Sequence, residues 1–82
     1  MDKSIYTREY AAVLRLLREA RDQAGITQVD LAKKLRQSQS YVSKVERGDR
    51  RLDIVQLRTI CHVLGLTLAE FVQRLERELS KR

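Results

Sequence analysis

Helix-ending and helix-starting residues follow one another closely along this chain of 82 residues, and they limit its possible folds more than any other feature. A glycine just after an apolar-patterned segment is typical of a helix end, and this place is taken by Gly25, Gly48 and Gly65. A side-chain oxygen that can cap a first turn is supplied by Thr7, Thr27, Ser38, Asp53 and Thr67. Because the chain also has no proline and no strand-like alternation, it predicts five helices joined by short turns.

Apolar residues recur at helical spacing within three of these segments. In the first, predicted to end near residue 24, the inward-facing residues are Val13, Leu14, Leu17, Ala20 and Ala24. In the fourth, predicted for residues 54–64, they are Ile54, Leu57, Ile60, Cys61 and Leu64. In the fifth they are Leu68, Phe71, Val72, Leu75 and Leu79. The second and third helices, predicted for residues 28–35 and 38–47, are shorter.

The length of the chain allows one small domain. Such a domain buries roughly 60–65% of the surface of its unfolded chain, so its core is modest and dimerisation would stabilise it. A hydrophobic content of 43% with 34% charged residues is typical of a soluble helical protein rather than a disordered segment. We therefore predict a single compact all-α domain over residues 1–82, with a core of about residues 10–75 and frayed ends at residues 1–6 and 80–82.

The net charge of +6 is concentrated in one window of the sequence. Residues 33–51 hold seven basic side chains and two acidic ones, which accounts for +5 of the total. The basic residues are Lys33, Lys34, Arg36, Lys44, Arg47, Arg50 and Arg51, and the acidic ones are Glu46 and Asp49. A local excess of this kind favours a polyanionic partner such as nucleic acid.

Several classes of protein are disfavoured by the sequence. Cys61 is the only cysteine and the adjacent His62 the only histidine, so the chain cannot assemble a typical metal site from them, and we expect no metal and no cofactor. No catalytic triad, glycine-rich phosphate loop or paired-carboxylate site stands out, which argues against an enzyme. The first ten residues lack the apolar core of a signal peptide, and no apolar run is long enough to span a membrane. A lone cysteine allows no intramolecular disulfide, so we expect a cytoplasmic protein.

The stretch from residue 27 to residue 47 predicts two short amphipathic helices joined by a tight turn. The outer face of the second helix carries side chains that can donate and accept hydrogen bonds, namely Gln39, Ser40, Tyr41, Ser43 and Lys44. Several of these are poor helix formers, so solubility alone does not explain the choice. Glutamine, by contrast, can bind adenine with two hydrogen bonds. The stretch therefore predicts a helix-turn-helix that contacts the bases of double-stranded DNA.

At this spacing the sequence resembles the lambda-repressor-like, Cro/C1-type (XRE) helix-turn-helix family. The resemblance spans roughly residues 16–72 and is carried by the segments LREARDQAGITQVDLAKKL, SQSYVSKVERGDR and LRTICHVLGLTLAEF. It implies that the base contacts come from Gln39, Ser40, Tyr41, Ser43 and Lys44. It also implies that Gln28 touches a phosphate and braces the recognition helix. Finally, it implies a buried ion pair between Arg21 and Glu46.

Further residues in and after the helix-turn-helix, all basic except Gln28, are expected to contact DNA phosphates. The expected phosphate contacts are Gln28, Lys33, Lys34, Arg36, Arg50 and Arg51. Arg36 departs from the family's pattern, in which glycine usually holds this position in the turn. We therefore expect Arg36 to adopt a left-handed conformation, at a cost of roughly 1 kcal/mol.

These features together predict a sequence-specific transcriptional regulator that binds double-stranded DNA as a homodimer on an inverted-repeat operator. Leu75 and Leu79 extend the apolar stripe of the last helix beyond the family's core, which favours a dimer interface, although the same residues could instead fold back onto the monomer. An alternative function is a protein-interaction module, such as an antitoxin, whose last helix binds a partner protein such as a toxin. Contact with RNA polymerase through Asp22 and Asp30 is a further hypothesis.

Overall fold

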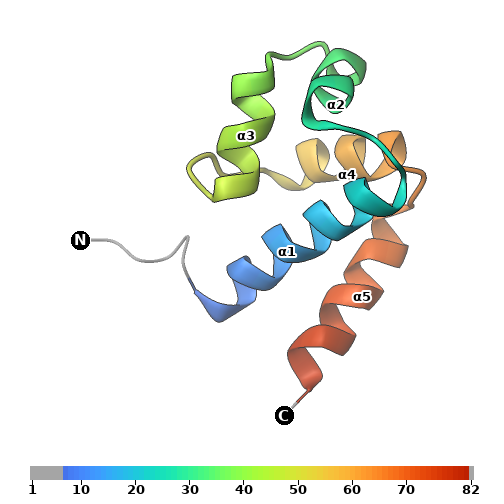
Figure 1. The fold of residues 1–82 in the computed structure, drawn as a ribbon. Coiled ribbons are helices and arrows are strands. Elements are labelled where there is room, and N and C mark those ends of the chain that lie inside the picture. Colours follow the sequence, from blue (N-terminus) through green and yellow to red (C-terminus); the bar gives the residue numbers. More distant parts are fainter. Residues whose placement is uncertain (1–6, 82) are drawn as a thin grey trace.

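The computed structural model describes residues 7–81, which form five α-helices (Figure 1). They are α1 (Arg8–Gln23), α2 (Gln28–Leu35), α3 (Gln39–Arg47), α4 (Ile54–Val63) and α5 (Leu68–Ser80). No strand occurs among these residues, so the predicted all-α architecture is confirmed. The expectation of fraying at residues 1–6 and at residue 82 lies outside the described residues, while α5 continues through Ser80.

Each helix begins at a residue whose side chain accepts a hydrogen bond from the amide three residues further on, as the sequence predicted. These residues are Thr7, Thr27, Ser38, Asp53 and Thr67. At α2, α4 and α5 the side chain three residues on returns a hydrogen bond to the capping residue's own amide. A good cap contributes about 1 kcal/mol. This contribution matters most in a helix as short as α2, which has eight residues.

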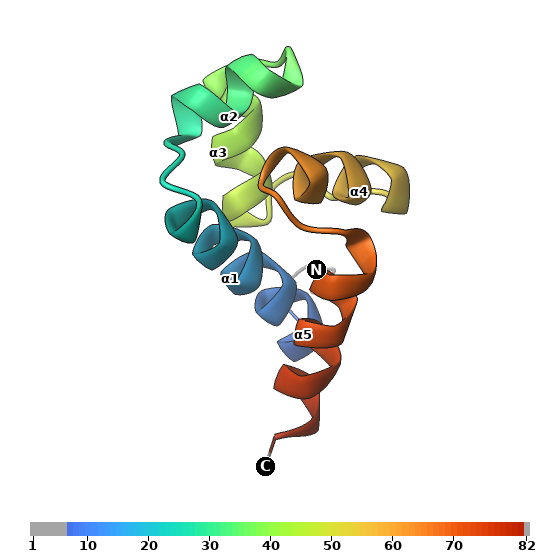
Figure 2. The same ribbon diagram turned by 90° about the vertical axis from the view of Figure 1, so that its right-hand side faces the viewer.

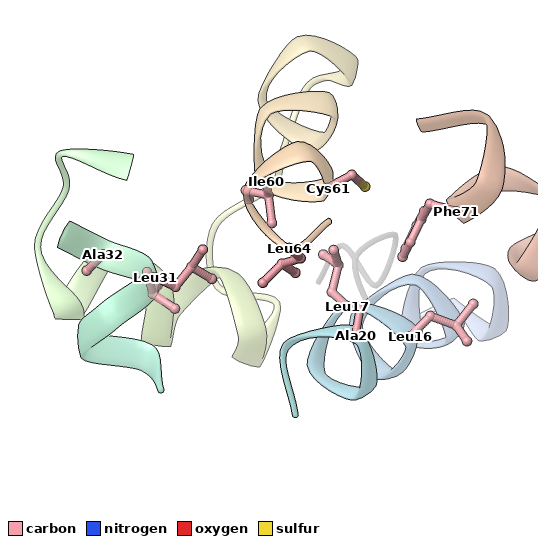
Figure 3. Close-up of a cluster of buried hydrophobic side chains, with 10 residues drawn as sticks. Leu16, Leu17, Ala20, Leu31, Ala32, Ile60, Cys61, Leu64 and Phe71 are labelled. Carbon is pink, nitrogen blue, oxygen red and sulfur yellow. The ribbon is translucent and has the colours of Figure 1, made fainter. Parts of the chain in front are cut away.

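Side chains from all parts of the bundle meet in one hydrophobic core (Figure 3). The buried cluster consists of Leu16, Leu17, Ala20, Leu31, Ala32, Val42, Ile60, Cys61, Leu64 and Phe71. In Figure 3, Leu17 and Leu64 lie between the α2 side chains on one side and Phe71 of α5 on the other. The core thus holds the helix-turn-helix, formed by α2 and α3, against α1, α4 and α5.

The inward face of α1 differs from the predicted stripe. The residues that α1 buries are Ala12, Leu16, Leu17 and Ala20. Ala24, which was predicted to face inward, is exposed because α1 ends one residue earlier and Ala24 is its C-terminal cap. Val13 and Leu14 are only partly buried.

The prediction that Ile54 belongs to the inner stripe of α4 is wrong. Ile54 is 68% exposed, and its neighbour Val55 is 67% exposed. Both lie in the first turn of α4, whereas the helix meets the core near its other end through Ile60 and Cys61. Val72, predicted to face inward from α5, is also 40% exposed.

The helix-turn-helix and the end of α5 lie at opposite ends of the molecule (Figures 1 and 2). In both views α2 and α3 lie at one end and the last turns of α5 lie at the other (Figures 1 and 2). The helix α1 packs against α3 and α5, and α4 packs against α2 and α5, within dimensions of 36 × 32 × 21 Å.

Within this described part of the chain, no single helix has the length and hydropathy needed to cross a membrane; α4 and α5 meet that test only as a pair, bent by 103°.

Cys61 is a core residue. Its side chain is 0% exposed, and burial raises the pKa of its thiol to about 11. The thiol is therefore neutral at physiological pH and enclosed, which suits packing rather than nucleophilic chemistry. Among residues 7–81, no three His, Cys, Asp or Glu side chains are grouped so that they could hold a metal ion.

The tight turn between α2 and α3 depends on one left-handed residue. Arg36 has φ 58° and ψ 41°, and it is the only non-glycine residue with a positive φ among residues 7–81. The expected left-handed conformation is therefore confirmed. The amide of Arg36 donates to the carbonyl of Lys33 (3.1 Å), and the amide of Gln37 donates to the carbonyl of Ala32 (2.9 Å). These bonds satisfy the last carbonyls of α2 and redirect the chain into α3.

Replacing Arg36 by glycine is expected to raise the free energy of unfolding by up to about 1 kcal/mol, because glycine adopts this conformation without the clash of a β-carbon. The melting temperature, followed by circular dichroism, should rise by about 4–8 °C for each kcal/mol gained. Gln37→Gly is the matched control, since Gln37 does not have a positive φ and glycine there should only destabilise. A melting temperature for Arg36→Gly at or below that of the wild type would contradict the strain argument.

Candidate nucleic-acid interface

The helix α3 exposes a polar face and buries its valines. Val42 and Val45 are 2% and 3% exposed. On the other face, the exposed side chains are Gln39, Ser40 and Lys44, and the partly buried ones are Tyr41 and Ser43. Among the residues predicted to contact bases, Gln39, Ser40 and Lys44 are therefore the accessible ones, whereas Tyr41 packs partly against the core.

A chain of hydrogen bonds, here called the Gln39–Arg21 network, runs from the start of α3 back to α1. Gln39 Nε2 donates to Gln28 Oε1 (3.1 Å), and Gln28 Nε2 donates to Glu46 Oε1 (2.9 Å). Glu46 accepts two further bonds from Arg21, from Nε to Oε2 (2.6 Å) and from Nη2 to Oε1 (3.0 Å). The network thus links α1, the start of α2 and both ends of α3.

The ion pair between Arg21 and Glu46 forms the buried end of this network. The two side chains are only 13% and 7% exposed. Arg21 Nη1 also donates to the carbonyl of Ile26 in the turn after α1 (3.0 Å). The hydrogen bond with Glu46 raises the pKa of Arg21, although burial acts in the opposite direction. The guanidinium therefore stays charged and holds the carboxylate in a fixed place.

The charge of Glu46 sets the direction of every hydrogen bond in the network. A carboxylate can only accept, so Gln28 must turn its amino group toward Glu46 and its carbonyl oxygen toward Gln39. Gln39 must then donate one N–H to that oxygen. The network leaves the carbonyl oxygen of Gln39 and its second N–H unused at an exposed position at the start of α3.

Exposed basic side chains surround this surface. The residues predicted to contact phosphates from the basic window are Lys33, Lys34, Arg36, Arg50 and Arg51, and all five are exposed. The guanidinium carbon of Arg50 lies 5.1 Å from the centre of the Tyr41 ring, and that of Arg51 lies 4.5 Å from the centre of the Tyr10 ring. Stacking on the Tyr41 ring restrains Arg50 while leaving its in-plane N–H groups able to bind an anion.

Comparison with known proteins identifies the family to which this fold belongs. A family model described as helix-turn-helix (HTH_3) matches residues 17–71. The solved structure of an XRE-family like protein from Pseudomonas syringae pv. tomato is 42% identical, with 93% of each chain covered and a TM-score of 0.84. This chain belongs to the XRE family of helix-turn-helix proteins.

Two further solved structures resemble this XRE chain. The wild-type restriction-modification controller protein C.Esp1396I is 31% identical over 92% of this chain and 99% of its own, with a TM-score of 0.81. The clp gene regulator ClgR from Corynebacterium glutamicum is 28% identical over 90% of this chain and 79% of its own, with a TM-score of 0.78. The search of curated proteins gives no match. Membership of the XRE family establishes the general function, that of a DNA-binding transcription regulator.

Arg47, at the end of α3, makes contacts that were not predicted from the sequence. Arg47 Nη1 donates to Ser43 Oγ (2.7 Å), and Arg47 Nε donates to Asp49 Oδ2 (3.0 Å). The hydroxyl oxygen of Ser43 is therefore already engaged in the free protein, and the carboxylate of Asp49 offsets the charge of Arg47. The spacing of four residues between Ser43 and Arg47 on one helix was the signal that could have indicated this contact.

Leu75 and Leu79 lie in the second half of α5, whose last turns are at the opposite end of the molecule from α2 and α3 (Figures 1 and 2). Both side chains are partly buried. The end of α5 is fastened to α1 by an ion pair from Arg15 Nη2 to Glu78 Oε2 (2.7 Å) and a bond from Arg8 Nη2 to the carbonyl of Leu79 (3.2 Å). This placement fits the fold-back alternative, and the predicted role of both leucines in a dimer stays a prediction.

Proposed function

We propose that this chain is a sequence-specific regulator that binds double-stranded DNA as a cytoplasmic homodimer, with α3 of each copy in a major groove. The observation that carries the proposal is the orientation of Gln39. Its unused carbonyl oxygen and N–H form the acceptor–donor pair that adenine complements with its N6 amino group and N7.

Neighbouring side chains on α3 extend the proposed base contacts. Ser40 and Lys44 are exposed beside Gln39, so they face the same groove. We assign smaller roles to Tyr41, which packs partly against the core and under Arg50, and to Ser43, whose oxygen accepts from Arg47. Base preference should therefore depend most on Gln39, Ser40 and Lys44.

Phosphate contacts would hold α3 in register along the duplex. The proposed contacts are Gln28, Lys33, Lys34, Arg36, Arg50 and Arg51. Gln28 is the first residue of α2, where free backbone amides also favour an anion. The charge of +5 within residues 33–51 should make the affinity for any duplex fall steeply as salt is added.

Selection from a random duplex pool at physiological salt tests the proposal directly. We expect an enriched inverted repeat whose half-sites lie roughly 10–10.5 base pairs apart, centre to centre, or a multiple of that spacing. Each half-site should contain an adenine whose replacement weakens binding. Recovery of pool DNA with no motif would contradict sequence specificity, and no binding at all would leave the protein-interaction module as the better hypothesis.

Arg50→Ala is expected to weaken binding to every duplex by a similar factor, because Arg50 would contact only the backbone. The slope of log affinity against log salt concentration should become shallower by about 1 per copy, as measured by titration between low and physiological salt. Arg18→Ala is the charge-matched control, since Arg18 is exposed on α1 outside the basic window. A loss confined to the selected operator would contradict the assignment of Arg50 to phosphate.

A further inference from the structure

Arg47 is a basic residue on the polar face of α3 that has no part in the DNA contacts proposed above. Residues four apart on a helix lie on one face, and Arg47 follows Gln39 and Ser43 at this interval. Its side chain is 59% exposed. At 1.5 Å per residue, Arg47 stands roughly 12 Å further along α3 than Gln39. It therefore ends the face that we propose enters the groove, three residues before Arg50, which we assign to phosphate.

The guanidinium of Arg47 already holds a carboxylate. Arg47 Nε donates to Asp49 Oδ2 (3.0 Å), while Nη1 donates to Ser43 Oγ (2.7 Å). A guanidinium binds a carboxylate and a phosphate through the same pairs of N–H groups. One such pair is Nε with Nη2, which Arg21 uses to hold Glu46. A phosphate that binds Arg47 through this pair needs the Nε–H that Asp49 now holds.

Asp49 stands at a place that does not favour a carboxylate. Its side chain is 44% exposed, whereas Glu46, the other acidic residue within residues 33–51, is 7% exposed. The amide of Asp49 donates to the carbonyl of Lys44 at the C-terminal end of α3 (2.9 Å), where the helix dipole favours cations. An exposed anion here also repels a polyanionic partner. The ion pair with Arg47 is thus what this carboxylate contributes to the surface.

From these contacts, we propose that Asp49 competes with DNA for Arg47, which it occupies in the free protein and releases to a backbone phosphate in the complex. The inference rests on the proposed function for the placement of α3 in the groove. Each copy then gives up one ion pair on binding, and the carboxylate of Asp49 is left without that partner. The contact lowers the affinity for every duplex, because phosphate oxygens are the same in every sequence.

A double-mutant cycle tests the competition. The affinity for one random duplex is measured for the wild type, Asp49→Ala, Arg47→Ala and the double variant. Loss of a negative charge strengthens binding in both backgrounds, so the difference between the backgrounds isolates the contact. We expect Asp49→Ala to strengthen binding about two- to fivefold more when Arg47 is present, which is the range that an exposed ion pair contributes. An ion pair that persisted unchanged in the complex would give no difference.

The phosphate contact of Arg47 has its own measurement. Arg47→Ala should make the slope of log affinity against log salt concentration shallower by about 1 per copy. Glu76→Ala is the control for Asp49→Ala, since it removes an exposed negative charge on α5, outside the basic window. Its effect on affinity should be the same whether Arg47 is present or not. Circular dichroism melting confirms that every variant folds.

Two outcomes would overturn the inference alone, with operator binding intact. In the first, Arg47→Ala leaves the salt slope unchanged, so Arg47 does not contact a phosphate. In the second, the effects of Asp49→Ala and Arg47→Ala simply add, so Asp49 keeps Arg47 in the complex. Coupled effects in a protein that binds every duplex equally well would refute sequence specificity and leave the inference standing. A wild type that binds no duplex would refute both.

Discussion

Replacing Arg21 by methionine is expected to lower the free energy of unfolding by roughly 3–5 kcal/mol, because it leaves the carboxylate of Glu46 buried without its counter-charge. A chain of this size has only a small margin of stability, so the loss should unfold a large part of the population at physiological temperature. Urea denaturation followed by circular dichroism measures the effect. A loss below about 1 kcal/mol would show that water reaches the pair and screens it.

The double variant Arg21→Met/Glu46→Leu separates stability from DNA binding. Replacing both partners of a buried pair by apolar residues of similar size is often close to neutral, so much of the lost stability should return. The amino group of Gln28 would then have no carboxylate to bind, and Gln39 would lose the bond that fixes its direction. We therefore expect a folded protein whose affinity for its operator is reduced while its affinity for random duplex is kept. Equal affinity for the operator would contradict the orienting role of the network.

Replacing Gln39 by alanine is expected to cost roughly 1–3 kcal/mol of operator binding and to remove the preference for one base pair in each half-site. The reason is that two hydrogen bonds to one adenine are lost together. Competition binding with the operator and its single-base variants measures both effects. At each half-site, the adenine that matters to the wild type should become interchangeable with the other bases.

Gln37→Ala is the matched control for this experiment, because Gln37 is an exposed glutamine two residues earlier and outside the Gln39–Arg21 network. It should leave base preference unchanged. Gln28→Ala should reduce part of the same preference, and combining it with Gln39→Ala should cost less than the sum of the two single changes, since both break one shared bond. If Gln39→Ala weakened random duplex and operator by the same factor, Gln39 would not contact a base.

Local features of this chain could be predicted from its sequence because their causes lie within a few residues. The capping box from Thr27 to Asp30 depends only on neighbouring residues along the chain. The left-handed conformation of Arg36, by contrast, was expected from the family resemblance. The inward positions of Phe71 and Ile60 followed from helical spacing. The prediction that Ile54 is buried was wrong because a periodic pattern does not say how far the neighbouring helices extend along α4.

The contacts within the candidate site were harder to predict from the sequence. The pairing of Arg21 with Glu46 was expected only from the resemblance, since nothing local connects side chains 25 residues apart. The bond between Gln28 and Glu46 and that between Gln28 and Gln39 depend on how α2 crosses α3. That crossing is set by the left-handed turn and by the packing of Ala32 and Val42 in the core. The residues of the candidate site could be predicted from the sequence, but the directions in which their side chains point relative to one another could not.

The Gln39–Arg21 network also constrains how the base preference of such a regulator can change after gene duplication. A substitution at Gln39 that cannot donate removes the hydrogen bond to Gln28 Oε1, so a new base preference at this position also disturbs the side chain of Gln28. Ser40 and Lys44 take no part in the Gln39–Arg21 network, so single substitutions at these two positions leave the network intact. Paralogues should therefore acquire new operators first through these two positions, while the adenine contact persists as an inherited part of the binding site.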